Sequence, residues 1–204
     1  MIRFQPFAPT KLNILKELPV HPEKLNPHKI SLVRAVVGKT PKTLRLVEKI
    51  FHPGLGSDNH EFKAVQHFVA SAHLKKLGVP VAEAMLMPTK DGTRVFFHDP
   101  AKGNQKNIFE WADMDDNVRW ESQNVSNYEQ IRRVIDEHTR TAQTKGFEIH
   151  PRAWSIYRDG KTGEWKPIIH DFKWIDFVTE KAGSFLDDWS RVEKKLSRMK
   201  ADLL

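Results

Sequence analysis

Four stretches of the chain hold charged or titratable side chains in positions where they could do chemistry. Lys49 lies in an apolar, strand-like run, and Glu61 lies in the first turn of an expected helix. Glu148 and His150 are two positions apart, and Asp171 follows another apolar run. Side chains of these types supply a fixed positive charge, acid–base groups and hard oxygen ligands. Each also has an ordinary structural explanation. Lys49 could be a surface lysine and Glu61 the acid of a helix cap. The residues at 148 and 150 could brace a loop, and the acid at 171 could form a turn.

The ten histidines do not form a pattern typical of a metal site. His60, His67 and His73 share one expected helix, but no two of them are spaced i, i+4, and no second cluster completes a site. The chain has no cysteine, so it can have neither a disulfide framework nor a thiolate metal site. We therefore expect no structural zinc.

Composition and charge limit the class of protein. The chain has 204 residues, of which 39% are hydrophobic and 29% charged, values typical of one globular domain or two small lobes. The formal net charge is +7, and residues 1–60 contain ten Lys/Arg against four acids. This basic region indicates either an anionic partner or a solvated basic face.

The chain contains no apolar stretch of the roughly 18 residues that a membrane span needs, so we expect no membrane partner. Residues 1–20 lack the apolar core of a signal peptide. These features favour a cytoplasmic protein, or one secreted into a host cell without a cleavable signal peptide.

The six tryptophans are scattered along the chain, which favours packing in a core over the stacking of bases in a basic groove. We therefore do not expect nucleic acid as a partner, although a basic nucleic-acid-binding α+β protein remains an alternative. The tryptophans are Trp111, Trp120, Trp154, Trp165, Trp174 and Trp189.

Periodicity and turn residues predict an α+β protein. Residues 1–29 hold five prolines and predict an irregular arm, with one short helix near 12–18. Helices are expected from 58 to 77, from 126 and over 185–203, the first two with capping boxes at Asp58/Glu61 and Ser126/Glu129. Strands are expected over residues 30–37, 43–51, 82–87, 93–97 and 165–170, with hairpin turns at 91–92 and 159–163.

This order of elements resembles that of protein kinases, down to their metal-binding segment. Kinases hold the phosphates of ATP with a lysine on the third strand, pair it with a glutamate of the next helix, and bind Mg²⁺ with an aspartate after a hairpin. The resemblance therefore implies that Lys49 binds phosphate, that Glu61 pairs with it, and that Asp171 binds the metal. Gly38 is the one glycine near the first expected turn, where the resemblance implies a glycine-containing loop that binds the phosphates of ATP.

The resemblance continues, with departures, in the segment 146–155, which is similar to the His-Gly-Asp-Leu-His-Pro-Gly-Asn-Ile-Leu pattern of phosphotransferases. Glu148 stands at the catalytic aspartate, where it can still accept a proton. Ala153 stands at the second metal ligand and cannot bind a metal, and Gly146 replaces the first histidine.

The resulting expectation is a protein-kinase-like fold with a small β-rich N-lobe and a truncated helical C-lobe. Its parts are an arm (1–29), an N-lobe (30–98), a connection (99–125) and a reduced C-lobe (126–204). The expected function is ATP/Mg²⁺-dependent transfer of phosphate to a protein hydroxyl (Ser or Thr), with Glu148, His150 and Asp171 as catalytic residues. The alternative is a catalytically inactive pseudokinase that binds a regulatory partner.

Overall fold

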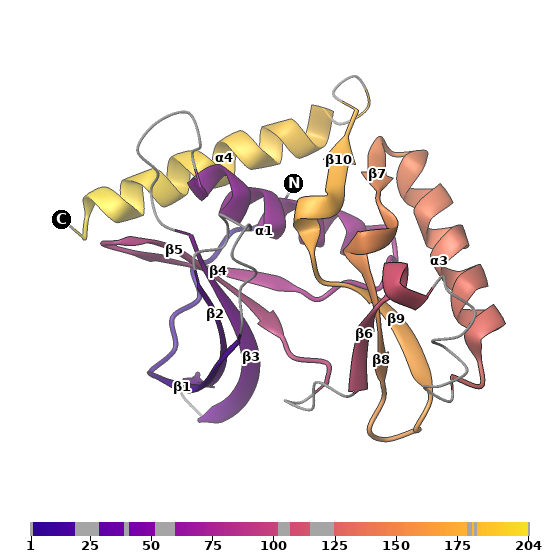
Figure 1. Cartoon of the computed structure of the whole chain (residues 1–204). Helices are drawn as coiled ribbons and strands as arrows, with labels where there is room; N and C mark the ends of the chain where they lie inside the picture. The colour runs from indigo at the N-terminus through magenta and orange to yellow at the C-terminus, as the bar shows by residue number, and fades with distance from the viewer. Residues whose placement is uncertain are drawn as a thin grey trace. The chain divides into compact units, whose positions relative to one another are not determined.

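The computed structural model describes residues 2–18, 29–38, 41–51, 60–101, 107–114, 125–178, 181 and 183–203. The chain divides into two compact units. Unit 1 comprises Met1–Ala72, Glu83–Asp99 and Ser184–Leu204, and unit 2 comprises His73–Ala82 and Pro100–Gly183. The architecture is α+β, with mostly antiparallel sheets and three α-helices among the described residues (Figure 1).

Unit 1 is built on a five-stranded antiparallel sheet with the strand order β1-β2-β3-β5-β4. The predicted hairpin between β4 and β5 forms, but its turn is at Lys90 and Asp91, and Gly92 already belongs to β5, where it pairs with Thr89. The strands are β1 (Lys11–Leu18), β2 (Lys29–Val37), β3 (Lys42–Phe51), β4 (Ala84–Thr89) and β5 (Gly92–His98).

The first strand corrects the sequence prediction of an irregular arm with a short helix near 12–18. β1 pairs antiparallel with β2, with an irregularity in register between Ile14 and Lys16. Its side chains are mostly exposed, including Ile14 at 55% and Leu15 at 38%. Only Leu12 and Leu18 are partly buried, and Leu12 packs against the core of the sheet. Because the strand buries so little, the spacing of its apolar residues does not separate a strand from a helix, and backbone pairing with β2 decides its structure.

Helix α1 (His60–Lys76) covers one face of this sheet. The ring of His67 contacts Phe51 of β3 and Phe97 of β5, at centroid distances of 5.3 and 5.8 Å. The hydroxyl of Ser71 accepts a hydrogen bond from the backbone N–H of Ala84 at 3.2 Å. The capping box predicted for this helix falls on residue 58, outside the described residues.

The C-terminal helix α4 (Gly183–Ala201) groups with unit 1, whereas the sequence placed it with residues 126–204. Trp189 of α4 contacts Phe62 of α1, with ring centroids 4.0 Å apart. The predicted apolar face of the helix is buried at Phe185, Trp189, Val192 and Leu196.

The N-terminal segment, residues 2–9, also packs within unit 1. The ring of Phe4 contacts Phe68 of α1, and Phe7 contacts Phe96 on β5, with centroid distances of 5.3 and 4.9 Å. The backbone N–H of Phe7 donates to the carbonyl of Leu86 at 2.7 Å. Phe96 lies on the face of the sheet that carries Val33, Ala35 and Leu46, so this segment helps to cover the face that includes them.

Unit 2 contains a three-stranded sheet, β6-β8-β9, and a separate two-stranded pair, β7 with β10. The sequence did not predict β6, β7 or β10, which have three residues each and are too short to show a period. The strands are β6 (Ile108–Glu110), β7 (Phe147–Ile149), β8 (Trp154–Arg158), β9 (Trp165–Ile169) and β10 (Ile175–Phe177); the single-turn helices are η2 (Trp111–Met114), η3 (Pro151–Ala153) and η4 (Phe172–Trp174).

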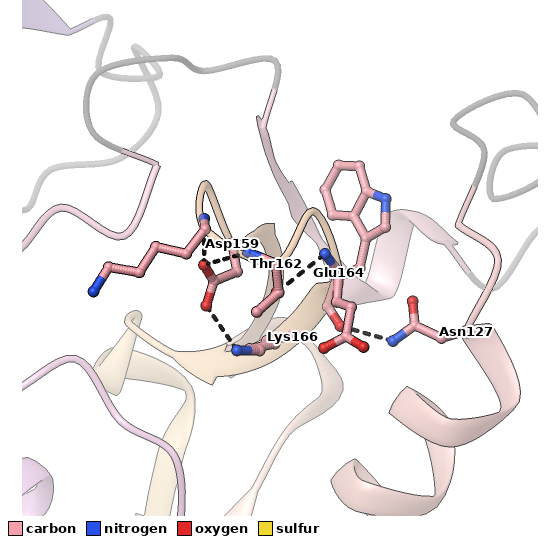
Figure 2. Close-up of polar contacts among 7 residues, drawn as sticks. Asn127, Asp159, Thr162, Glu164 and Lys166 are labelled. Atoms are coloured by element: carbon pink, nitrogen blue, oxygen red, sulfur yellow. Dashed lines mark hydrogen bonds and ion pairs between the residues drawn. The ribbon is translucent and has the colours of Figure 1, made fainter.

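Helix α3 (Tyr128–Gln143) forms close to the start predicted at 126, but the predicted capping box is wrong. Asn127, and not Ser126, is the N-cap residue, and its side chain makes no capping hydrogen bond to the helix. The Asn127 amide donates instead to the carbonyl of Trp165 in β9, at 2.9 Å (Figure 2). This tertiary contact ties the start of α3 to the β8–β9 hairpin.

The β8–β9 hairpin is closed by a network around Asp159 (Figure 2). One carboxylate oxygen accepts the backbone N–H groups of Lys161 and Thr162 at 2.8 and 3.4 Å, and the other accepts from Lys166 at 2.7 Å. The hydrogen bond from Lys166 and those from the backbone lower the pKa of Asp159 from 3.8 to about 2. The turn predicted at 159–163 is therefore held by the Asp159 side chain together with the backbone hydrogen bonds from Asp159 to Glu164 and from Gly163 to Asp159.

Within the described ranges, none of the helices combines the length and the apolar character needed to cross a membrane.

Candidate functional site

In unit 1, the candidate residue Lys49 is buried in the middle of the sheet. Its side chain is 6% exposed, and its ammonium nitrogen lies 5.3 Å from the centroid of the Phe97 ring. Phe97 in turn contacts His67 of α1, so Lys49 lies on the α1 side of the sheet. Burial of a lysine ammonium is costly unless anionic or aromatic groups surround it, so this is an unusual position for a surface-type residue.

The neighbouring residue, Glu48, is fully buried on the opposite face of the sheet. Arg94 of β5 donates to one of its carboxylate oxygens at 3.0 Å. Its other oxygen, and the hydroxyl of its cross-strand neighbour Ser31, make no hydrogen bond to another described residue. Adjacent residues of β3 therefore place opposite charges on the two faces of one sheet.

The other two candidates of this region are Glu61 and Gly38. Glu61 is in the first turn of α1, but its side chain lies outside the described part of the structure, so no contact with Lys49 is described. The α1 side chain that the structure does place beside the Lys49–Phe97 pair is His67, which the sequence analysis considered only for zinc. Gly38 has φ 82 and follows the last residue of β2. Its turn leads from the second strand to the third, and not from the first to the second, because β1 precedes β2.

In unit 2, the structure brings the segment around His150 next to the segment around Asp171. The backbone N–H of His150 donates to the carbonyl of Trp174 at 3.0 Å. The N–H of His170 donates to the carbonyl of Ala153 at 3.4 Å. These two bonds fix the turn η3 against the turn η4, so that two candidate regions about 20 residues apart form one cluster.

His150 has a clear structural role in this cluster. It is the N-cap residue of η3, and its Nδ1 accepts the backbone N–H of Arg152 at 3.2 Å. An Nδ1 that accepts a hydrogen bond leaves the proton of the neutral ring on Nε2. The imidazole also stacks on Trp174, at 5.2 Å between centroids.

Glu148 and Ala153 differ in exposure and chemistry. Glu148 is exposed on β7, directly opposite the exposed Asp176 of β10. Like charges at opposed positions of a sheet destabilise it slightly, so the two acids are in a place that stability alone does not favour. Ala153 is buried and has no group that could bind a metal.

Asp171 lies between β9 and η4, where Phe172 anchors the turn in the core. Its Oδ2 is 3.3 Å from the Lys173 ammonium, and the two side chains are 19% and 28% exposed. Ile169, two residues earlier, exchanges backbone hydrogen bonds with Pro80 and Ala82, which fix the end of β9. A partly exposed carboxylate on a fixed backbone is a suitable ligand for a hard cation.

Trp174 lies at the centre of this cluster, a role that its sequence context does not indicate. Besides His150, the Arg152 guanidinium and the Lys173 ammonium lie 5.3 and 5.1 Å from the ring centroid. No spacing in the sequence could have indicated this, because 20 residues separate the two contributing turns. Trp111, Trp154, Trp165 and Trp189 are buried, which agrees with the packing role expected for tryptophans.

The described residues contain no group of three or more His, Asp or Glu side chains arranged to hold a metal ion. Mg²⁺ is commonly held by only one or two carboxylates, together with the phosphates of a nucleotide and water. Asp171 fits that mode of binding, and Ala153 does not add a ligand to it.

No protein-family model matches the chain, and no curated protein matches it.

Proposed function

We propose that the protein is an ATP- and Mg²⁺-dependent phosphotransferase of a reduced protein-kinase-like fold that acts on a protein hydroxyl. The observation that carries the proposal is the burial of Lys49 in β3, on the face of the sheet that α1 covers. A fixed, desolvated ammonium interacts strongly with phosphate, and phosphoryl transfer depends mainly on such positioning and charge neutralisation.

The order of the elements also supports the proposal. Three strands, α1, the strands β4 and β5 and the short strand β6 precede α3, and the β8–β9 hairpin then leads to Asp171. This is the order in which protein kinases place their lysine, their helical glutamate and their metal-binding aspartate.

Each residue has a defined task under this proposal. Lys49 holds the α- and β-phosphates of ATP, and Glu61 would keep it oriented. Asp171 would hold Mg²⁺, which neutralises charge on the phosphate oxygens. The acceptor oxygen forms a bond to the γ-phosphorus, the bond to the β–γ bridging oxygen breaks, and Glu148 takes the hydroxyl proton. His150 keeps the loop in place through its cap on η3.

A catalytically inactive pseudokinase is the second candidate, and two observations favour it. Ala153 supplies no second metal ligand, and Glu148 lies on a strand opposite Asp176 and not in the turn that follows. A pseudokinase would bind the nucleotide without turnover.

A thermal-shift measurement on the full chain with ATP, with and without Mg²⁺, tests the proposal. A ligand at 100 times its dissociation constant stabilises the native state by about 2.7 kcal/mol. We expect this stabilisation to require Mg²⁺ and to be lost in Lys49→Met and Asp171→Ala. Lys42→Met is the matched control, because it removes the same charge from the exposed start of β3.

Transfer of labelled γ-phosphate to protein acceptors then separates the two candidates. Transfer that Glu148→Gln abolishes supports the phosphotransferase, and Mg·ATP binding without transfer supports the pseudokinase. If wild-type protein shows no shift with ATP in either condition, both are wrong.

A further inference from the structure

Lys173 neutralises the carboxylate to which the proposed function assigns the metal. Its ammonium lies 3.3 Å from Oδ2 of Asp171, and both side chains are partly exposed. A divalent cation at this carboxylate would meet the Lys173 charge at close range, where two cations repel each other.

In the same position, the Lys173 ammonium has a second favourable partner besides Asp171. The same ammonium lies 5.1 Å from the centroid of the Trp174 ring, within the range of a cation–π interaction. Lysine has a flexible four-carbon stem, so it can leave the carboxylate and keep the ring contact. Its displacement therefore costs mainly the ion pair, which is weak at a partly exposed position, and it leaves Lys173 at a ring that the Arg152 guanidinium also contacts.

We infer that Lys173 is a built-in competitor for the metal at Asp171 and sets the Mg²⁺ concentration that the protein requires. The inference rests on the proposed function, because that function assigns the metal to Asp171. Lys173 occupies the carboxylate when no metal is bound and moves toward the Trp174 indole when the metal binds. Removal of its charge strengthens metal binding.

Other roles for Lys173 predict a different effect on Mg²⁺ binding when its charge is removed. If Lys173 were a phosphate ligand, loss of its charge would weaken the binding of Mg·ATP. If it only stabilised the turn η4, its loss would lower the melting temperature without changing the Mg²⁺ dependence of binding. The direction of the change in Mg²⁺ affinity thus distinguishes the three roles.

The experiment compares wild type, Lys173→Gln and Lys145→Gln, each as the full chain. Lys145→Gln is the matched control, because it removes an exposed lysine charge elsewhere in unit 2. Mg²⁺ is titrated at a fixed concentration of a non-hydrolysable ATP analogue, and binding is followed by thermal shift. We expect the half-saturating Mg²⁺ concentration to fall about two- to fivefold in Lys173→Gln, as loss of a partly exposed ion pair predicts, and to stay unchanged in Lys145→Gln.

A metal-only readout uses terbium, an oxygen-binding cation whose luminescence Trp174 can sensitise. Lys173→Gln should shift the terbium titration to lower concentration by a similar factor, and Asp171→Ala should remove this signal. An unchanged or weaker affinity in Lys173→Gln, by either readout, would overturn the inference while leaving the proposed function intact. Absence of nucleotide binding and of an Asp171-dependent terbium signal in wild type would overturn both.

Discussion

Both carboxylate oxygens of Asp188 lie 3.1 Å from the backbone nitrogen of Ile2, although 186 positions separate the two residues. Asp188 is buried in α4 and also accepts from Arg191 at 2.8 Å. Lys195, which lies four residues after Arg191 in α4, donates to the carbonyl of Phe4 at 3.0 Å. The C-terminal helix therefore holds the N-terminal segment within unit 1.

Replacement of Asp188 by alanine should destabilise the protein. The change leaves the N–H of Ile2 without its buried acceptor, and an unsatisfied buried donor costs about 1–3 kcal/mol. Urea denaturation measures the loss. Asp187→Ala is the matched control, because Asp187 is the exposed neighbour on the same helix. Equal midpoints for the two variants would show that the Asp188 contact does not contribute.

Loss of Arg94 should be more costly, because it leaves the fully buried Glu48 without the cation that pairs with it. Breaking a buried ion pair at one partner typically costs about 3–5 kcal/mol, whereas replacing both partners by apolar groups is often neutral. We expect Arg94→Met to lower the free energy of unfolding by roughly this amount and the double variant Arg94→Met/Glu48→Met to recover most of it.

The control for this pair is Arg34→Met on β2, whose side chain is exposed. Chemical denaturation measures the free energy of unfolding of wild type, Arg94→Met, the double variant and Arg34→Met. A double variant as unstable as Arg94→Met would contradict the prediction, because the cost would then not arise from the uncompensated carboxylate.

Replacement of Gly146 by alanine should lower the stability of the protein more than the same replacement at Gly163. Its φ is +82, and an added Cβ would lie 2.7 Å from Cβ of Lys181. Gly163 has a similar φ of +75 but open space around it. We expect Gly163→Ala to cost about 1–2 kcal/mol from its left-handed backbone alone, and Gly146→Ala to cost more, as thermal unfolding can show. Similar costs would mean that Lys181 moves aside freely.

The stability of the β8–β9 hairpin should depend on pH, because folding shifts the pKa values of Asp159 and Lys166. The pKa of Asp159 is lowered, so its contribution to stability is present above pH 3.8 and is lost as the pH falls toward 2. The hydrogen bond with Asp159 raises the pKa of Lys166, so that contribution is present below pH 10.5 and is lost at higher pH.

Carbon-detected NMR titration of the Asp159 carboxyl checks this prediction. Lys166→Gln should move the pKa of Asp159 up from about 2 toward 3.8, because the hydrogen bond from Lys166, the largest cause of the lowered pKa, is then removed. Lys161→Gln, which keeps the backbone N–H that Asp159 accepts, is the control and should leave the midpoint in place. A midpoint near 3.8 in wild type would show that the network does not form in solution.

Several elements could be predicted from the sequence because their residues carry a local signal. The helix α4 has a regular apolar period, the turn at 159–163 has Asp and Gly where a hairpin needs them, and α3 begins where the apolar face begins. The reason for a glycine at position 146 could not be predicted in this way, because the side chain that leaves no room for a Cβ there belongs to Lys181, far along the chain.

The amino-acid sequence by itself determined the α+β composition, the long helices and the candidates Lys49, His150 and Asp171, since periodicity and residue type are local properties. The tertiary structure decided what no local pattern records. It made residues 11–18 a strand through pairing with β2, and it joined α4 to the N-terminal segment. It also gathered His150, Arg152 and Lys173 around Trp174. Such contacts join segments far apart in the chain, so their free energy depends on how the whole unit packs and not on the order of neighbouring residues.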